Sequence, residues 1–538
     1  MKLTVVTVSS VIIRDIISAN DEINEKWPES LELKIYFAGR SVDKCKYKEM
    51  ETNLQSADIV ILDLMGADTE IQSFIAEVCS NVSGDLIAIG GENNHIQELT
   101  RLGSFSISDM SGMPMMKGGT VDLSFMNKMK DMIDKIGDRF LKGKMRDIRN
   151  YIYILRYWRC SSDSDMQNLL YFLLREYGKV ERIPRPEKPS DTTEETGICS
   201  PVNRKHYCSI DEYAAVNGFD EKRPSVVVLY YGHDYPNRTS KCVGQFIDKI
   251  NDFANVIPIM FTTVSGDGVG KLKAIIEDSG KYKIDAIINF MSFRLGAGPM
   301  GGDADAAIEA LKEFDVPLFH PFFMSKREIE EWKDSPQGIS PSEFLISVML
   351  PELDGCIETI PIGAMVNSGN NPKYDVKLSE LSLIDERADK IASRVKNWLT
   401  LRTKQNKDKR VAIICYNYPP GEDNLFGGAF LDTFKSIEKL LLTLHEDGYS
   451  VDELTAEQLM EEFTAGKLTN WGKWVEVQTS NMIKYDKNSY ESYLSSKSWE
   501  KDMVDQWGES PGNIMSEGDN FLIPGLVNGN IFIGLQPS

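Results

Sequence analysis

The first 120 residues alternate between short apolar runs and stretches with helical spacing of apolar positions. The runs LTVVTV, LELKIYFA, ADIVILDLMG and DLIAIGG are rich in β-branched side chains and are bounded by polar residues or glycine. Between the last two runs, TEIQSFIAEVCSNV carries apolar residues every three or four positions, which is typical of a helix. Near-continuous apolar strands that alternate with helices predict a parallel sheet covered on both faces. Residues 1–120 are therefore predicted to form an N-terminal α/β domain.

The pattern changes after residue 120. LSFMNKMKDMIDKIGDRF and SDMQNLLYFLLREYG repeat apolar residues at helical spacing, so residues 121–180 are predicted to be a helical insert. RIPRPEKPSDTTEETG then combines proline, charge and hydroxyl side chains without a period. This composition indicates a linker or long surface loop across residues 181–215.

Two further α/β regions are predicted from the same alternation. Residues 216–400 contain the expected strands SVVVLYYG, ANVIPIMFT, IDAIINFM and VPLFHPFF, with helical stretches between them. Residues 401–538 contain the expected strand KRVAIICYNYPP near their start. They end with NFLIPGLVNGNIFIGLQPS, which is typical of two strands joined by an Asn-Gly turn. This third α/β segment is expected to be a truncated domain. The predicted fold class is thus α/β, multidomain, with several parallel-sheet units and a helical insert.

The composition narrows the function classes. The 538 residues carry 81 acidic and 60 basic side chains, a net charge of -21, which disfavours nucleic acid as the main partner. Eight scattered cysteines without a CxxC pair are typical of reduced thiols, so a cytoplasmic location is predicted. The apolar N-terminus is interrupted by Arg14 and is expected to be a strand, and the chain has no apolar run long enough to span a membrane.

Two glycine-rich stretches resemble nucleotide-binding loops but depart from the required patterns. SGDGVGKL has Ser265 where a P-loop needs its first glycine, and Leu272 offers no hydroxyl to Mg²⁺. The sequence therefore predicts that this chain does not hydrolyse ATP by itself. GAGPMG at residues 296–301 fits the dinucleotide pattern, but Pro299 lacks a backbone N–H, so a flexible strand-to-helix loop is favoured over an NAD site.

Two features lie where parallel sheets usually bind ligands, at the carboxyl ends of predicted strands. His233 and His320 each end such a strand, and either could take a proton or remain a loop or core residue. The second feature follows the strand Val411–Cys415, where a proline pair ends the strand and a glycine-rich loop leads to a helix with Asp432 as its expected N-cap. This strand–loop–helix could cradle an anionic group, and an ordinary αβ loop would have the same pattern.

The order of three sequence boxes is more specific than any single motif. LPELDG occupies Leu350–Gly355, the NYPP…LDT..S box occupies Asn417–Ser436, and GN.FIG.QP occupies Gly529–Pro537. This succession resembles the large subunit of CobN-type cobaltochelatase and its relative, the H subunit of magnesium chelatase. The resemblance is clear over residues 200–538 and loose over the first 180 residues.

The resemblance implies a large, tetrapyrrole-binding chelatase subunit that inserts cobalt into a corrin-precursor macrocycle. AAA+ ATPase partner subunits would hydrolyse the ATP, in agreement with the incomplete P-loop. Insertion of Mg²⁺ into protoporphyrin is the alternative within the family, and a non-catalytic tetrapyrrole- or metal-binding module is the alternative outside it. The metal stays open because no complete ligand set is visible in the sequence.

Metal insertion requires that two pyrrole N–H protons leave the macrocycle, which calls for carboxylate or imidazole bases in an enclosed site. The predicted catalytic residues are His320, Glu352 and Asp354, and the two carboxylates could instead belong to a solvated turn before Gly355. The predicted macrocycle-binding residues lie in the second and third boxes: Tyr418, Gly427, Gly428, Asp432 and Gln536. No metal-ligating residue is predicted.

Overall fold

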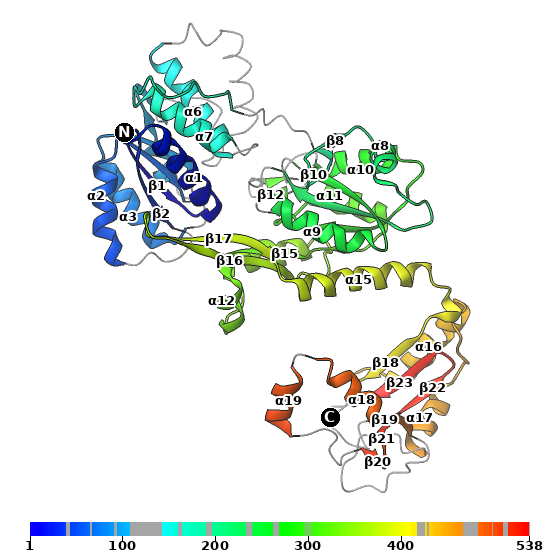
Figure 1. The fold of residues 1–538 in the computed structure, drawn as a ribbon. Helices are drawn as coiled ribbons and strands as arrows, with labels where there is room; N and C mark the ends of the chain where they lie inside the picture. The colour runs from blue at the N-terminus through cyan, green and yellow to red at the C-terminus, as the bar shows by residue number, and fades with distance from the viewer. Residues whose placement is uncertain are drawn as a thin grey trace. The chain divides into compact units, whose positions relative to one another are not determined.

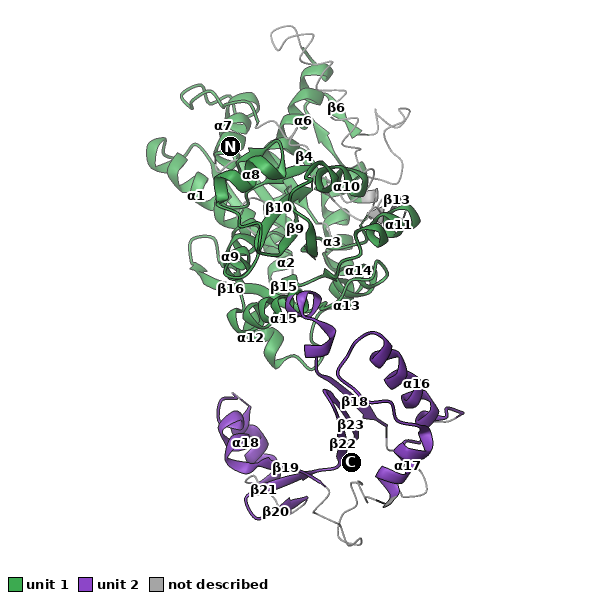
Figure 2. Ribbon diagram, turned by 90° about the vertical axis from the view of Figure 1, so that its right-hand side faces the viewer, with its two compact units in different colours: residues 1–399 green, residues 400–538 purple. Residues whose placement is uncertain are grey.

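The computed structural model describes residues 1–38, 44–64, 67–90, 94–107, 142–159, 164–189, 196–232, 239–261, 268–295, 297–298, 301–302, 304–416, 425–427, 430–465, 482–497, 499–508 and 515–536. They form two compact units, residues 1–399 and residues 400–538 (Figure 2). Each unit is described by itself below.

The first sheet of unit 1 has the strand order β2-β1-β3-β4-β5-β6, and Figure 1 shows its strands β1 and β2 in the blue N-terminal part of the chain. Its strands are β1 (Lys2–Thr7), β2 (Glu32–Phe37), β3 (Ile59–Asp63), β4 (Asp85–Gly90), β5 (Arg101–Leu102) and β6 (Phe105–Ser106). The first four strands in this order pair in parallel, and the two short strands close one edge antiparallel.

Helices cover both faces of this sheet. One face packs against α1 (Ser10–Lys26), α6 (Lys144–Arg159) and α7 (Asp165–Glu176), and the other against α2 (Tyr47–Gln55), α3 (Thr69–Ser80) and α4 (Asn94–Glu98). The predicted parallel sheet with two covered faces is confirmed. The helix expected for SDMQNLLYFLLREYG is α7, and together with α6 it forms a covering layer of the first sheet. The helix expected at 123–140 lies outside the described residues.

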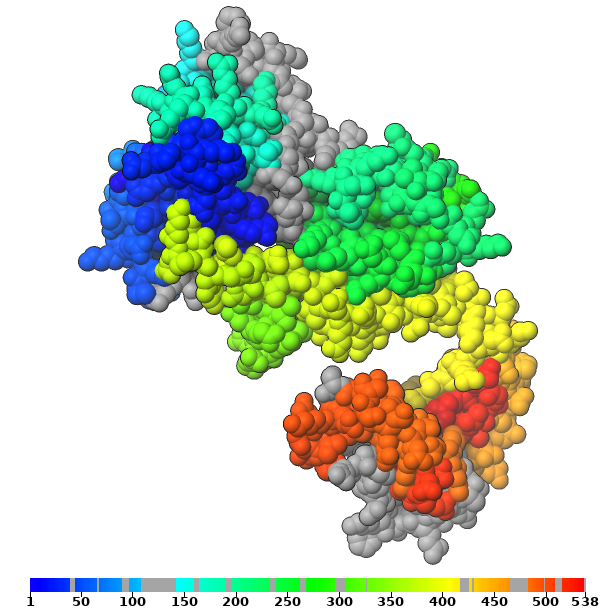
Figure 3. All heavy atoms as spheres, viewed as in Figure 1, coloured from blue at the N-terminus to red at the C-terminus, as the bar shows by residue number. Residues whose placement is uncertain are grey.

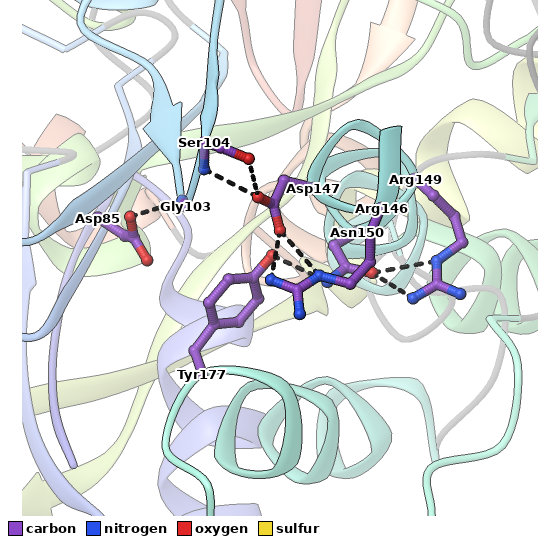
Figure 4. Close-up of polar contacts among 8 residues, drawn as sticks. All are labelled: Asp85, Gly103, Ser104, Arg146, Asp147, Arg149, Asn150 and Tyr177. Atoms are coloured by element: carbon purple, nitrogen blue, oxygen red, sulfur yellow. Dashed lines mark hydrogen bonds and ion pairs between the residues drawn. The ribbon is translucent and has the colours of Figure 1, made fainter. Parts of the chain in front are cut away.

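A polar network around the buried Asp147 ties α6 to the turn between β5 and β6 (Figure 4). Asp147 accepts hydrogen bonds from the main-chain N–H and hydroxyl of Ser104 at 2.8 and 2.7 Å, and its other oxygen pairs with Arg146. Gly103 has φ +58°, and a Cβ there would stand 2.5 Å from the Asp147 carboxylate, so the turn requires glycine. Because Asp85, which accepts from the Gly103 N–H, begins β4, this network lies at the amino end of the sheet. Its place and contacts indicate a structural anchor, since parallel sheets bind ligands at the carboxyl edge.

The second sheet of unit 1 has the order β14-β11-β9-β10-β7-β8, with the first four parallel. Its strands are β7 (Gly197–Cys199), β8 (His206–Tyr207), β9 (Ser225–Tyr231), β10 (Asn255–Phe261), β11 (Ile284–Asn289) and β14 (Leu318–Phe319). One face is covered by α9 (Thr239–Asn251) and α15 (Asp385–Thr403), the other by α8 (Ile210–Asn217), α10 (Gly268–Asp278) and α11 (Ala304–Phe314). Three of the predicted strands, SVVVLYYG, ANVIPIMFT and IDAIINFM, are confirmed as β9, β10 and β11, whereas VPLFHPFF divides into β14 of this sheet and the start of β15 (Phe322–Glu328) in another sheet. β7 and β8 lie within residues 181–215, the stretch predicted to be a linker or surface loop.

A small third sheet completes unit 1. It consists of β15 (Phe322–Glu328), β16 (Pro361–Asn371) and β17 (Val376–Leu383), and the last two form a long antiparallel hairpin. The remaining short elements are β12 (Ala297–Gly298), β13 (Gly301–Gly302), α12 (Ile329–Asp334), α13 (Pro341–Phe344) and α14 (Leu350–Glu352). No helix in the described part of the chain is both long and apolar enough to cross a bilayer.

Unit 2 contains a sheet with the order β18-β23-β22, whose core side packs against α16 (Thr433–Glu446) and α17 (Ala456–Ala465). Its strands are β18 (Val411–Cys415), β22 (Gly525–Asn528) and β23 (Ile531–Leu535). The predicted C-terminal hairpin is confirmed, because Asn528 pairs with Ile531 across a turn in which Gly529 has φ +58°. A second small sheet, β19 (Ile483–Asp486), β21 (Asn520–Ile523) and β20 (Ser516–Glu517), accompanies α18 (Lys487–Leu494) and α19 (Glu500–Trp507).

Candidate functional site

The carboxyl edge of the second sheet places His320 beside Asn289. Asn289 ends β11 and His320 directly follows β14, and these two strands are parallel neighbours. The His320 Nδ1 lies 2.8 Å from the main-chain oxygen of Asn289, and its main-chain N–H donates to Ile357 at 2.8 Å. Since a carbonyl only accepts, Nδ1 carries the ring proton, and Nε2 has a free lone pair.

His320 is fully buried, and burial lowers its pKa from 6.5 to about 4. Main-chain hydrogen bonds with Asn289 and Ser347 act in the opposite direction and raise this pKa, but by less. The ring is therefore neutral at pH 7. Nε2 has no hydrogen-bond partner among the described residues. A buried acceptor without a partner costs about 1–3 kcal/mol, so this nitrogen is available to a donor that enters the site. His233, the other strand-end histidine of the sequence analysis, lies outside the described residues.

The LPELDG box puts its two carboxylates into different surroundings. The Asp354 side chain is buried and accepts from Arg294 Nε at 2.8 Å and from the Leu295 N–H at 2.7 Å. Burial raises the pKa of Asp354, while these two donors oppose the shift. Glu352 is exposed and accepts from the Thr359 hydroxyl at 2.6 Å. Of the two, only Glu352 fits the alternative of a solvated turn.

Backbone irregularity surrounds this edge of the sheet. Residues Leu345–Met349 form a π-helix, a rare conformation that often marks functional sites. Its buried Ser347 lies with its hydroxyl 3.1 Å from that of Ser292, and the Ile346 oxygen accepts from the Phe293 N–H at 2.7 Å. Phe293 itself has φ +69°, which is strained for an aromatic residue. The apolar pattern of this stretch gave no signal for Ser347.

In unit 2, the third sequence box ends at the sheet edge where β18 ends, just before the second box in the sequence. β18 and β23 are parallel, so their carboxyl ends lie together, and the Gln536 N–H donates to the Cys415 oxygen at 2.8 Å. Gln536 and Tyr416, the residues after the two strands, are both exposed. Tyr418 and Gly428 lie outside the described residues.

The loop that leads into α16 contains one buried phenylalanine and one exposed phenylalanine. Phe426 is buried, packs against Phe434 and Phe463, and accepts a hydrogen bond from the Thr433 hydroxyl at 2.7 Å. Phe430 is fully exposed and, like Phe426, has positive φ. Gly427, next to the anchor, is partly buried.

Asp432 is the N-cap of α16, as predicted. Its side chain accepts from the Lys435 N–H at 3.0 Å, so it already satisfies one of the free N–H groups at the start of this helix. An anionic ligand at the helix start would therefore have to compete with the Asp432 carboxylate.

The predicted site residues thus fall into two groups. His320, Glu352 and Asp354 belong to unit 1, whereas Gly427, Asp432 and Gln536 belong to unit 2. Within the described ranges, no three or more His, Cys, Asp or Glu side chains come together in a way that could hold a metal ion. The divalent ion of the predicted reaction is a substrate, so the residues that would hold it are not required to form a resident metal site.

The fold is that of a multidomain α/β protein whose parallel strands end together at shared sheet edges. The sequence profile of the CobN/Magnesium Chelatase family matches residues 155–538, and a domain of unknown function matches residues 2–169. The chain belongs to the CobN/magnesium chelatase family.

Individual relatives agree with this membership. The magnesium-chelatase subunit ChlH of Oryza sativa subsp. indica is 27% identical over 530 residues, covering 92% of this chain and 36% of the relative. The aerobic cobaltochelatase subunit CobN of Pseudomonas aeruginosa is 29% identical over 59% of this chain and 25% of its own length. The solved catalytic subunit of cobaltochelatase from Mycobacterium tuberculosis superposes with a TM-score of 0.55 at 17% identity, covering 100% of this chain and 39% of that one, which indicates a shared fold.

Proposed function

We propose that this chain is part of the large, tetrapyrrole-binding subunit of an ATP-dependent chelatase that inserts cobalt into a corrin-precursor macrocycle. The observation that carries the proposal is the shared carboxyl edge of β18 and β23, where the main-chain bond from Gln536 to Cys415 holds the third family box beside the strand that leads into the second box. The chain spans about a third of the rice relative's length, so the activity of a whole subunit is part of the proposal.

The exposed aromatic residues near this edge suit a flat macrocycle. Tyr416 follows β18 and is 57% exposed, and Phe430 projects from the loop before α16. Aromatic faces stack on planar π-systems and exclude water from them. In this proposal Tyr416, Tyr418 and Phe430 contact the ring, while Gly427 and Gly428 let the main chain approach it. Asp432 and Gln536 would fix the orientation of its polar substituents.

The proposed catalytic residues have different roles. Glu352 is exposed and could act as a general base. Neutral His320 could accept a proton at Nε2 only from a group that reaches its buried ring. Asp354, which is held by Arg294 and Leu295, would position the loop after β11.

The ATP would be hydrolysed on AAA+ partner subunits. Leu272, which stands where a P-loop needs a hydroxyl, is completely buried in the core of the second sheet and cannot serve a nucleotide-bound Mg²⁺. The acidic net charge of -21 disfavours nucleic acid as the main partner, and the eight scattered cysteines without a CxxC pair favour a cytoplasmic location.

Magnesium insertion into protoporphyrin is the second candidate. It is favoured by the length of the matches, because the rice magnesium-chelatase subunit aligns with 92% of this chain and the Pseudomonas cobaltochelatase subunit with 59%. A non-catalytic tetrapyrrole-binding module remains the third, since the chain covers only part of each relative.

Absorbance titration of the chain with a cobalt-free corrin precursor and with metal-free protoporphyrin tests the proposal. We expect saturable binding of the corrin precursor and at least tenfold weaker binding by Tyr416→Ala and Phe430→Ala. Tyr493→Ala is the matched control, because Tyr493 is equally exposed in the same unit but lies on α18.

Each outcome separates the candidates. Preference for protoporphyrin would select magnesium, and binding without metal insertion in single-turnover assays with ATPase partners would select the binding module. Binding of neither macrocycle, or equal losses in the Tyr493→Ala control, would overturn the assigned site.

A further inference from the structure

Arg294, in the loop after β11, is fixed in direction by a buried aspartate. Its Nε donates to the Asp354 carboxylate at 2.8 Å, and the Asp354 side chain is completely buried. The second Asp354 oxygen accepts from the Leu295 main-chain N–H at 2.7 Å. Each oxygen of this carboxylate therefore has a donor in the loop, and the Arg294 guanidinium is held in place at its Nε.

The two terminal nitrogens of Arg294 have no hydrogen-bond or ion-pair partner among the described residues. The side chain is 20% exposed, so most of it is covered while part of it reaches solvent. Arg146 shows the other arrangement, because its Nε and one terminal nitrogen both donate to Asp147 in the network of the first sheet. At Arg294 the described contacts use Nε alone, which leaves the terminal N–H groups available to a ligand.

Arg294 lies at the sheet edge where the predicted catalytic residues are found. The loop that carries it connects β11 to the glycine-rich β12–β13 hairpin, and its anchor Asp354 belongs to the LPELDG box together with Glu352. Within residues 289–303 and 341–359, which contain this loop and this box, Arg294 is the only lysine or arginine. An anionic group that binds at these two segments therefore has one cation to pair with.

The free end of a guanidinium selects for planar or multi-oxygen anions. Its two terminal nitrogens lie in one plane and donate in parallel, which matches two oxygens of a carboxylate or of a phosphate. The macrocycles of the proposed reaction carry carboxylate side chains and no phosphate. A carboxylate is thus the anion of the proposed substrate that Arg294 is arranged to bind.

We infer that Arg294 binds a carboxylate side chain of the macrocycle and so orients the ring at this edge of unit 1. The inference rests on the proposed function, and it holds for cobalt and for magnesium because corrin precursors and protoporphyrin both carry carboxylates. Asp354 keeps the guanidinium in place while the ligand carboxylate accepts from its terminal N–H groups. Arg294 thereby favours a macrocycle with free carboxylates over one whose carboxylates are esterified.

Absorbance titration of the 538-residue chain with each metal-free macrocycle and with its methyl ester tests this role, because the ester keeps the ring and removes the negative charge. We expect the unchanged chain to bind the free acid about tenfold more tightly than the ester. Arg294→Gln should lower the affinity for the acid to that for the ester and leave the affinity for the ester unchanged. Arg294→Lys keeps the charge but offers a single nitrogen, so it should retain only part of the preference.

The matched control is Arg14→Gln. Arg14 of α1 also donates from its Nε to an aspartate, Asp15 at 3.2 Å, and its side chain is 33% exposed. This variant should keep the full preference for the acid, and urea unfolding should show that all three variants are folded.

The outcomes separate this inference from the proposed function. Equal binding of acid and ester by the unchanged chain, or an undiminished preference in Arg294→Gln, would overturn the role of Arg294 and leave the proposed function standing. The same loss of preference in Arg14→Gln would also overturn that role. Binding of neither form of either macrocycle would overturn the proposed function, and the role of Arg294 with it.

Discussion

At the scale of single residues, His320 is the most unusual side chain of unit 1. Its ring is fully buried at a sheet edge, with one nitrogen bonded to Asn289 and the other without a partner among the described residues. A neutral ring of fixed tautomer can act as an acceptor, and the same burial makes its protonated form costly.

This burial predicts a pH dependence of stability. The pKa of His320 is lowered in the fold from 6.5 to about 4, so between these values the unfolded chain binds the proton more tightly. The stabilising contribution is complete above pH 6.5 and is lost as the pH falls toward 4, by about 3 kcal/mol at most. Urea unfolding at pH 7 and pH 4.5 should show this loss.

The variant His320→Gln separates the contribution of His320 to the pH dependence of stability from that of the carboxylates. The variant should show a smaller decrease in unfolding free energy across the same pH interval. His445→Gln, a substitution at a half-exposed histidine of unit 2, should keep the full decrease. Equal pH dependence in the unchanged chain and His320→Gln would contradict the assignment.

At the scale of elements, the LPELDG box fastens the loop that follows β11. Asp354 reaches back 59 residues to the Leu295 N–H and 60 residues to Arg294, just before the glycine-rich stretch at 296–302. The chain after the box then runs beside β14, where Ile357 pairs with Phe319. The box thus connects α14, the sheet edge and a glycine-rich loop.

Removing the Asp354 carboxylate should loosen this connection. Asp354→Ala leaves Arg294, which is largely buried, without its partner, and we expect a loss of about 3 kcal/mol in unfolding free energy. Glu352→Ala, two residues away on the exposed side, should cost less than about 1 kcal/mol. Urea unfolding of both variants measures the difference.

A double-mutant cycle with Arg294→Ala locates the interaction. The losses in unfolding free energy of the two single variants should add up to about 1 kcal/mol or more above the loss of the double variant. The reason is that both single substitutions break the same ion pair. Additive losses would show that Asp354 stabilises the fold through another contact.

At the scale of the whole molecule, the β16–β17 hairpin links the two large sheets within unit 1. Tyr374 near its tip accepts from the Asn20 amide at 2.6 Å and donates to Asp21 at 2.8 Å, and Lys46 pairs with Asp375 at 2.5 Å. Tyr374 and its neighbours also pack against the core of the first sheet, which brings residues near 375 against the N-terminal region (Figure 3).

Weakening this contact should free α1 from the hairpin. Tyr374→Phe removes the hydroxyl from Asn20 and Asp21 and should cost about 1 kcal/mol, and Tyr374→Ala should cost more because the ring contact is lost as well. Hydrogen exchange should accelerate in α1 and in the hairpin tip, and it should remain unchanged in β9 and β10. Uniform exchange rates in all three proteins would show that the hairpin does not hold α1.

The sequence determined the local architecture because short-range patterns are enough for it. The apolar runs identified the parallel strands, the Asn-Gly signal identified the last hairpin, and Asp432 was recognisable as an N-cap. The ordered boxes pointed to the family, because each box is a contiguous segment that keeps its own pattern.

Only the tertiary structure decided which of these segments meet. Nothing in the pattern around Asp354 indicated that its carboxylate is buried against Leu295, or that Gln536 follows a strand paired with β18. These contacts join residues that are far apart in the chain. They therefore depend on how the sheets assemble and on which side chains become buried. For the same reason, the burial of His320 became visible only in three dimensions.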